Sequence, residues 1–369
     1  MPLLKPFRAL RYDVGAAGPL DDLVAPPYDV FTPELHERLL ARSPWNAARL
    51  VRPRRPEDAA RDLADWQARG ILVRDPEPAL WLVEEDFTGP DGVPRTRRGL
   101  AGRVKLEPYA AGVVLPHEDT FAEPKRGRLE LLRATRTKTS PVLMLHHGGT
   151  PEPRGEPDLR AELEGVVTRL WRITGADRIA SLAAEVEGPL LIADGHHRYE
   201  TALRFHEEEG SEETGHVLAV LVGKDDPGLE IFPTHRLTAG PVPELDGRFR
   251  RTPLAGPEEA GDALAGVGRD HAAFVLVRRG AAELVEAPGG RLDTLLVDEL
   301  PLADVAYTAS VAEAERAVAA GDAAAAFLVR APTVDQVESF ARAGERMPPK
   351  STYFFPKVTS GLLLSPFDE

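Results

Sequence analysis

The sequence predicts a mixed α/β protein built from two domains. A chain of 369 residues is long for one domain and comfortable for two. Its hydrophobic content of 43% and charged content of 28% are those of an ordinary globular protein. Short apolar runs that fit strands also alternate with segments of helical periodicity, and this pattern is typical of mixed α/β folds.

Composition and charge exclude several classes of function. The net charge of -14 and the pI of about 5.3 disfavour a large contact with a phosphate backbone, so we expect no nucleic-acid partner. The chain has no cysteine, which excludes a disulfide framework, a thiolate zinc site and a cysteine nucleophile. Residues 1–6 lack a signal-peptide core and no window reaches the length of a membrane span. We therefore expect a cytoplasmic protein without a membrane partner.

Residues 1–238 are expected to form the larger domain. A rigid corner at Pro26 and Pro27 precedes Thr32, which is a good helix N-cap because Pro33 follows it. The pattern beyond predicts an entry strand near residue 20, helices over 56–70 and 129–137, a mostly helical stretch over 159–184, and strands over 79–87, 98–104, 142–145 and 216–222. The strands that flank the turn at 89–92 would form an antiparallel insertion.

Residues 239–369 are expected to form a smaller α/β domain. The boundary is predicted at the Gly-Pro-Val-Pro segment 240–243. Helices are predicted over 257–265, 293–300, 311–319 and 333–343, and strands over 272–278, 282–286 and 324–328. The closing segment 347–357 holds two lysines and three aromatics between prolines, and we expect it to return to the cleft of the first domain.

The segment 189–203 carries the clearest chemical signal. An apolar run that fits a buried strand meets Asp194 and Gly195, and a helical pattern follows. A strand that passes through a glycine into a helix start presents unpaired N–H groups at the positive end of the helix dipole, which suits a phosphate. Gly195 lets the backbone come close, and Arg198 offers a bidentate fork to phosphate oxygens. Asp194 is either the helix N-cap or a carboxylate that holds a cation or a reacting hydroxyl.

The string Ile-Ala-Asp-Gly-His-His-Arg-Tyr-Glu-Thr-Ala resembles the signature of the bacterial and archaeal family called domain of unknown function 1015. Further segments that resemble this family lie at 26–29 (Pro-Pro-Tyr-Asp), 116–118 (Pro-His-Glu), 229–237 and 347–357. More distantly, the motif is similar to the Gly-x-x-Arg phosphate turn of the ParB/sulfiredoxin superfamily. That superfamily includes CTP-binding ParB proteins, sulfiredoxin and a kinase that phosphorylates free serine.

The resemblance implies a ParB/sulfiredoxin-like phosphate-binding core in the first domain. Sulfiredoxin chemistry is excluded because it needs a cysteine next to the arginine of the turn. The expected catalytic residues are Asp194, His196, Glu118 and Asp29. The expected nucleotide-binding residues are Gly195, His197, Arg198, His117, His235, Arg236, Lys350, Ser351 and Thr352. We expect the nucleotide to be ADP, ATP or CTP, with Mg²⁺ held in part by Asp194.

Two further groups of residues bear on ion binding. Five cations lie close together in an acidic chain, and they form either a solvated helix face or an anion site: Arg126, Arg128, Arg133, Arg136 and Lys138. A zinc site is not expected, because the available histidines show no His-Glu-x-x-His spacing: His117, His146, His147, His196, His197 and His235.

Three functions remain open from the sequence. The first is a nucleotide-dependent phosphotransferase for serine or another small hydroxyl compound, since phosphoryl transfer needs mainly positioning and charge neutralisation. The second is a nucleotide-binding switch without turnover, and the third is a protein that binds a phosphorylated metabolite. A small-molecule substrate is the expected partner, and a homodimer is left open.

Overall fold

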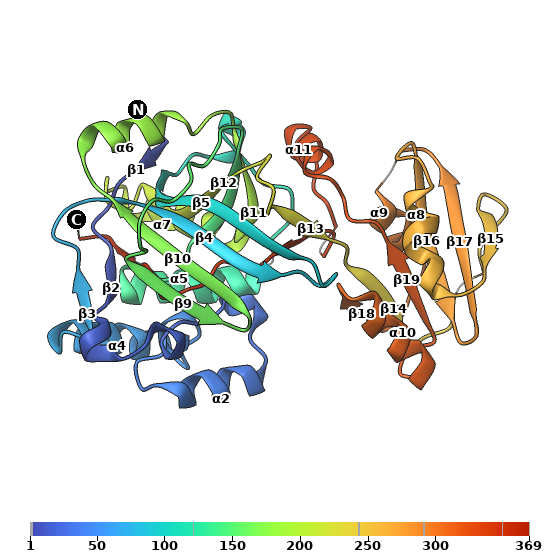
Figure 1. The fold of residues 1–369 in the computed structure, drawn as a ribbon, viewed down its shortest axis with the longest axis horizontal. Helices are drawn as coiled ribbons and strands as arrows, with labels where there is room; N and C mark the ends of the chain where they lie inside the picture. Colours follow the sequence, from blue (N-terminus) through green and yellow to red (C-terminus); the bar gives the residue numbers. More distant parts are fainter. Residues whose placement is uncertain (1–2, 121, 243, 291, 349, 369) are drawn as a thin grey trace. The chain divides into compact units, whose positions relative to one another are not determined.

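The computed structural model describes residues 3–120, 122–242, 244–290, 292–348 and 350–368 (Figure 1). The chain forms two compact units. The first contains Met1–Gly89, Val93–Leu229 and Pro356–Glu369, and the second contains Pro90–Gly92 and Glu230–Phe355. Both units combine helices with sheets, which confirms the mixed α/β class.

The limits of the two units differ from the predicted domains. The segment 240–243 lies inside the second unit, which begins at Glu230. The reason is the pairing of β14 (His235–Thr238) with β18 (Val305–Thr308) and β19 (Ala325–Val329), which are distant in the sequence. The end of the chain, from Pro356, belongs to the first unit.

A mixed sheet forms the centre of the first unit. Strand β8 runs parallel to β12 and antiparallel to β11, and the long β4–β5 hairpin continues the sheet. Every residue of β8, β11 and β12 is buried, which fits strands covered on both faces. In spatial order the sheet contains β6 (Val114–Leu115), β11 (Leu190–Asp194), β8 (Val142–His146), β12 (His216–Gly223), β5 (Pro94–Lys105), β4 (Leu80–Thr88), β10 (Val166–Ile173) and β9 (Leu159–Leu163), with β1 (Leu4–Lys5) also paired to β5.

The prediction of a mostly helical stretch over 159–184 is wrong. Residues 159–173 form the β9–β10 hairpin, and only α6 (Ala176–Ala184) is helical. The sequence Leu-Arg-Ala-Glu-Leu of β9 alternates between buried and exposed positions, which is the period of a strand. Glu164 and Gly165 between the strands have φ of 49° and 81°, as a tight hairpin turn requires.

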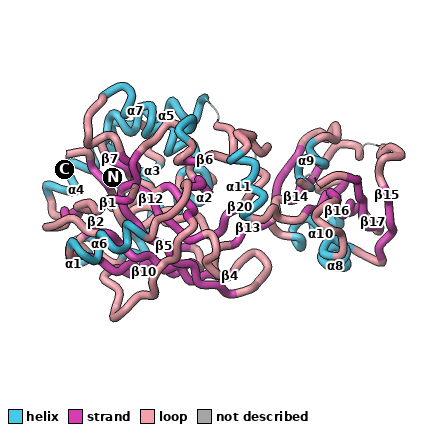
Figure 2. The backbone as a smooth tube through the Cα atoms, turned by 90° about the horizontal axis from the view of Figure 1, so that it is seen from above, coloured by secondary structure: helices cyan, strands magenta, loops and turns pink. Residues whose placement is uncertain are grey.

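Helices cover the sheet of the first unit, and α5 and α7 lie side by side (Figure 2). Thr32 caps α2 as predicted, because its Oγ1 accepts a hydrogen bond from the Leu35 N–H at 3.1 Å. The entry strand predicted near residue 20 is instead the 3₁₀ turn Leu20–Asp22. The helices are α1 (Val14–Ala17), α2 (Pro33–Arg42), α3 (Ala48–Val51), α4 (Pro56–Ala68), α5 (Ala122–Thr135), α6 and α7 (His196–Glu209).

The last segment of the chain is built into the first unit. Arg97 of β5 donates to the Pro356 carbonyl at 2.9 Å, and Phe367 stacks on Phe205 of α7 at 5.2 Å between ring centroids. Strand β21 (Ser365–Pro366) pairs with β7 (Thr137–Lys138), and Leu364 forms a bridge to the short pair of β2 (Leu10–Tyr12) and β3 (Leu72–Arg74). Lys357 is thereby fixed in this unit.

The second unit is a sheet with a core on each face. Its strands are, in spatial order, β15 (Arg250–Leu254), β17 (Ala281–Pro288), β16 (His271–Arg278), β19, β14 and β18. A separate pair joins β13 (Glu230–Phe232) to β20 (Tyr353–Phe355), and the helices are α8 (Ala260–Ala265), α9 (Asp293–Asp298), α10 (Val311–Ala320) and α11 (Val334–Arg342). Thr333 and Gln336 form a capping box on α11. Within the described ranges, no helix of either unit is long and apolar enough to cross a membrane.

Candidate functional site

The strand–glycine–helix turn that the sequence predicts to bind phosphate (the phosphate turn) is present as a backbone geometry, and phosphate binding there stays a prediction. Strand β11 ends at Asp194, Gly195 adopts a φ of 97°, and α7 begins at His196. Gly195 is the N-cap position and no side chain caps this end in the described chain, so Asp194 is not the cap. A Cβ at Gly195 would lie 2.9 Å from Cζ of Arg198, so only glycine lets the guanidinium lie against the turn.

Asp194 is the centre of a buried group of charges. Arg198 Nη2 donates to its Oδ2, and Lys357 Nζ donates to its Oδ1. The three side chains expose only 8% (Asp194), 10% (Arg198) and 19% (Lys357) of their surfaces. Arg198 Nη1 also donates to the carbonyl of Pro141, the residue before β8, while Lys357 is carried by the C-terminal segment.

The surroundings hold both Asp194 and Lys357 in their charged forms. Burial raises the pKa of Asp194, but the charges of Lys357 and Arg198 outweigh it and hold the pKa well below its usual range. Burial lowers the pKa of Lys357, but the charges of Asp194 and Asp29 raise it above its ordinary value. One carboxylate against two cations leaves one surplus positive charge at the positive end of α7, which favours an anion.

Asp29 lies near this cluster on the short turn Tyr28–Val30, directly after the double-proline corner. Its side chain is exposed, and its negative charge acts on the pKa of Tyr28, His197 and Lys357. The structure therefore brings Asp29 and the phosphate turn together, although 165 positions separate Asp29 from Asp194 in the numbering.

His117 and His196 form a buried pair beside the turn. Their rings meet edge to face with centroids 4.6 Å apart. The backbone N–H of His117 donates to Nε2 of the His196 ring at 3.3 Å. His117 Nδ1 bonds the Ile192 carbonyl at 2.8 Å, which identifies Nδ1 as the protonated nitrogen. Burial and His117 keep the pKa of His196 well below its usual value, so this ring is neutral. The pair ties the segment after β6, including the half-buried Glu118, to the turn.

Glu200 is a site residue that sequence reasoning missed. It accepts hydrogen bonds from Thr120 Oγ1 at 2.6 Å and from Lys125 Nζ at 3.1 Å, which joins α5 to the first turn of α7. The half-buried His197 lies within the field of Glu200 and Lys125, and burial lowers the pKa of His197. A glutamate at this position does not by itself indicate a functional site, because glutamate is equally common on the exposed face of a helix.

Five predicted nucleotide-binding residues belong to the second unit: His235, Arg236, Lys350, Ser351 and Thr352. His235 Nδ1 accepts from the Val329 N–H at 3.2 Å, and burial lowers its pKa to about 4. Arg236 makes two hydrogen bonds of 3.0 Å to Asp298. Val329 and Asp298 also belong to the second unit. A role of the five predicted residues at the phosphate turn therefore stays a prediction.

Asp194 does not fit the expected Mg²⁺ ligand in this arrangement. Both of its oxygens accept hydrogen bonds from cations, and the positive charges of Arg198 and Lys357 beside them disfavour a metal ion. Over the described ranges, no group of three His, Asp or Glu side chains could hold a metal ion. Asp29 is the carboxylate of this site that remains open to one.

Comparisons with known proteins agree with the sequence motif. A family model described as "Protein of unknown function (DUF1015)" matches residues 4–256. No match was found among curated proteins.

Solved structures similar to the chain include free serine kinase in complex with AMP, at 17% identity and a TM-score of 0.39, covering 69% of this chain and 86% of that one. A conserved hypothetical protein from Pyrococcus furiosus has 17% identity and a TM-score of 0.36, with 69% and 90% covered. SbnI from Staphylococcus aureus, with a C-terminal truncation, has 10% identity and a TM-score of 0.32, with 72% and 87% covered. Likeness at this level assigns no activity.

Proposed function

The chain belongs to the DUF1015 family, and from the charged turn at the start of α7 we propose that it is a nucleotide-dependent phosphotransferase for a small hydroxylated compound. The observation that carries the proposal is the surplus positive charge of Asp194, Arg198 and Lys357 beside the N-terminus of α7. A nucleotide phosphate supplies the negative charge that this cluster lacks, and the helix N–H groups donate to its oxygens.

Four residues of the site have a defined task in this reaction. Arg198 and Lys357 neutralise the charge that develops on the transferred phosphoryl group, and Asp194 positions both cations. The bond from the terminal phosphorus to the leaving nucleotide oxygen breaks as the bond to the acceptor oxygen forms. Asp29 accepts the proton of the acceptor hydroxyl, which suits an exposed carboxylate at the edge of the cluster.

The ligand classes are proposed from the resemblance that the sequence motif carries. We propose ADP, ATP or CTP as donor; one solved structure of free serine kinase is a complex with AMP, and another, of a mutant, is a complex with ADP. The acceptor proposed is serine or a related small hydroxyl compound, as the motif resemblance implies. Mg²⁺, if it enters with the nucleotide, would find Asp29 rather than Asp194 available.

Nucleotide binding is tested by thermal shift with ADP, ATP, CTP, GTP and pyrophosphate, each with and without Mg²⁺. A ligand at ~100 times its Kd stabilises the folded protein by about 2.7 kcal/mol, which raises the Tm by a few degrees. We expect this shift with at least one nucleotide for the wild type, and its loss in Arg198→Ala and Lys357→Met. An unchanged Tm with every nucleotide contradicts the proposal.

Transfer is tested by mass spectrometry of a mixture of hydroxyl compounds incubated with the nucleotide that binds. Asp29→Asn should lower the rate of product formation by about 100-fold or more, since a general base contributes at least that much, while nucleotide affinity changes only a few fold. Asp225→Asn is the matched control, because Asp225 is an exposed aspartate of the same unit. Equal rates in the two variants would remove Asp29 from the reaction.

Nucleotide binding without product would contradict transfer and favour a nucleotide-binding switch. A switch of this kind would assemble with its ligand, so light scattering with and without nucleotide separates it from simple binding. The same measurement tests whether the chain forms a homodimer.

A further inference from the structure

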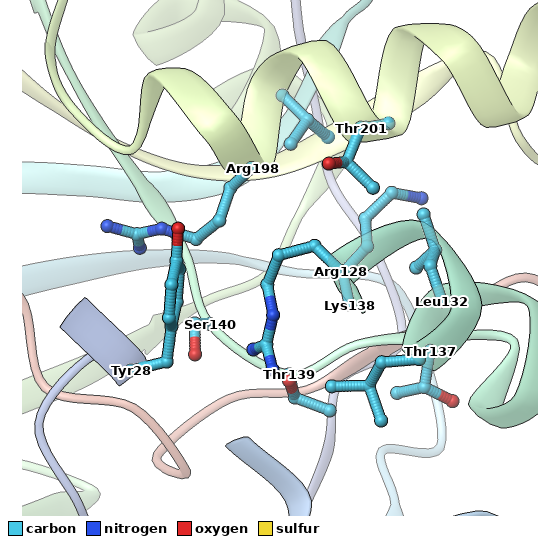
Figure 3. Close-up of a pocket in the computed structure, with 12 residues that line it drawn as sticks. Tyr28, Arg128, Leu132, Thr137, Lys138, Thr139, Ser140, Arg198 and Thr201 are labelled. Carbon is cyan, nitrogen blue, oxygen red and sulfur yellow. The ribbon is translucent and has the colours of Figure 1, made fainter. Parts of the chain in front are cut away.

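A second feature of the first unit is a pocket beside the phosphate turn, between α5, α7 and the segment 137–140 (Figure 3). The pocket measures about 500 Å³, counting the part that is open to solvent. Its lining includes Arg128, Lys138 and Arg198, together with hydroxyl side chains such as Thr201. Among the described residues that line it, none is an aspartate or a glutamate.

The run of five cations separates into two groups in the structure. Arg133 and Arg136 pair with Glu208 and Glu209 of α7 at 2.6 and 3.0 Å, where all four side chains are partly exposed. Arg128 and Lys138 instead line the pocket. The cations that the sequence left open between a solvated helix face and an anion site are therefore divided: one pair faces glutamates of α7, another pair lines the pocket, and the exposed Arg126 lies outside the pocket lining.

Arg128 is held without a carboxylate among the described residues. Its Nη1 donates to the Val51 carbonyl at 2.6 Å, and its guanidinium lies 4.3 Å from the ring centroid of Tyr28. Burial, together with the charges of Arg198 and Arg52, lowers the pKa of Arg128 to about 10, and the opposing influence of Tyr28 and Asp29 does not offset it. Lys138 Nζ lies 3.8 Å from the ring centroid of Phe367.

Two buried polar atoms of the pocket lining have no hydrogen-bond partner among the described residues. They are Nε of Arg198 and Oγ1 of Thr201, which lie one turn apart on α7. Thr201 is 4% exposed and the side chain of Arg198 is 10% exposed. A buried donor without a partner is costly, so the two atoms indicate that a ligand accepts hydrogen bonds there.

We propose that this pocket binds the carboxylate or phosphate group of a small anionic acceptor, whose hydroxyl then faces the phosphate turn. This inference rests on the proposed function, which identifies the bound molecule as the compound that accepts the phosphoryl group. Arg198 is shared between the two sites, because it pairs with Asp194 and also lines the pocket. Tyr28 lines the pocket and the next residue is Asp29, so the base and the anion site are adjacent. One face of the Tyr28 ring is already covered by Arg128, which disfavours a stacked nucleotide base.

Calorimetry with matched pairs of probes tests this site. L-serine and glycerate are the probes that carry a carboxylate, serinol and glycerol are their analogues without it, and inorganic phosphate is a further anion. We expect the wild type to bind each carboxylate probe at least about tenfold more tightly than its analogue, as charge-assisted hydrogen bonds predict. Equal affinity for the two members of a pair would overturn the proposal.

Two variants locate the binding. Arg128→Met removes a cation. Thr201→Val removes only a hydroxyl, because valine has nearly the same shape as threonine. Thr201→Val therefore keeps the test valid if Arg128→Met does not fold. Both should weaken anion binding by about tenfold or more while nucleotide affinity stays within about threefold. Arg133→Met is the matched control, since it removes a cation of α5 that pairs with Glu208 outside the pocket, and it should change neither affinity.

The outcomes separate this inference from the proposed function. If the protein binds nucleotide and the two variants leave its affinity for the anions unchanged, the proposed anion pocket is overturned and the proposed phosphotransferase function is retained. A parallel loss of nucleotide affinity in both variants also overturns it, because the pocket would then hold part of the nucleotide. Anion binding that depends on Arg128 and Thr201, in a protein that binds no nucleotide, supports the pocket and removes the proposed function.

Discussion

Gly195 is the residue on which the geometry of the phosphate turn depends most directly. Its φ of 97° is unfavourable for a residue with a Cβ, and that Cβ would also meet the guanidinium of Arg198 at 2.9 Å. Gly195→Ala should therefore lower the free energy of unfolding by about 1–2 kcal/mol, the cost of a left-handed conformation. It should also weaken nucleotide binding by about tenfold or more, because Arg198 is displaced.

Gly210 at the other end of α7 provides the control for this variant. Its φ is 67° and an added Cβ would meet no atom within 4 Å. Gly210→Ala should thus lower the stability by a similar amount and leave the nucleotide affinity unchanged. Both quantities are accessible by urea unfolding and calorimetry, and equal losses of affinity in the two variants would mean that strain alone, and not Arg198, accounts for the effect.

At the scale of the element, the C-terminal segment holds the first unit together and carries Lys357. Phe367 is 3% exposed, stacks on Phe205 and lies beneath Lys138. Arg103 fixes the preceding residues by donating to Ser365 Oγ at 3.0 Å and to the Pro366 carbonyl at 2.5 Å. This segment lies beyond the residues 4–256 that the family model matches, although it supplies a cation of the candidate site.

Phe367→Ala should destabilise the first unit by about 3 kcal/mol, the lower end of the range for a buried phenylalanine. The four tryptophans, Trp45, Trp66, Trp81 and Trp171, all belong to the first unit, so tryptophan fluorescence reports its unfolding selectively. Asp368→Ala is the control, because the Asp368 side chain is 75% exposed in its pair with Arg74 and should contribute less than about 1 kcal/mol. A loss in Phe367→Ala no larger than in this control would show that the segment is not an integral part of the unit.

At the scale of the whole molecule, buried histidines make stability depend on pH. Burial lowers the pKa of His146 and of His216 to about 4, and both belong to the first unit. For His216, the charges of Lys5, Arg103 and Lys138 contribute to this lowering of the pKa. In the unfolded chain a histidine binds its proton near pH ~6.5, so between pH ~6.5 and ~4 the unfolded state holds more protons than the folded state.

The free energy of unfolding of the first unit should therefore fall as the pH is lowered from about 6.5 to about 4. The contribution of each histidine is about 1–2 kcal/mol once screening by solvent is allowed for. His216→Leu removes one titrating ring, so tryptophan-monitored unfolding should show a smaller fall over the same interval for this variant than for the wild type. The same slope in both proteins would rule out His216 as a source of the dependence.

Local features of the chain determined much of this molecule. The β11–Gly195–α7 turn, the N-cap of α2, helix α4 and the hairpin turn at 89–92 all follow the sequence patterns that predict them. Such features depend on residues that are neighbours in the chain, namely on backbone preference, capping and periodicity, so the sequence alone specifies them. The motif also identified the family and the strand-to-helix turn of the candidate site.

Only the tertiary structure decided which distant residues meet at that turn. Lys357 reaches Asp194 because β21 pairs with β7 and Phe367 packs on Phe205, and no local pattern encodes those contacts. Likewise, Arg128 lines a pocket while Arg133 faces Glu208, although both lie on one helix and are alike in the sequence. The prediction of helix over 159–184 failed in part for the same reason, since β10 pairs with the distant β4 as well as with its neighbour β9. Strand pairing and charge partnership act across long separations in sequence, so they appear only when the chain has folded.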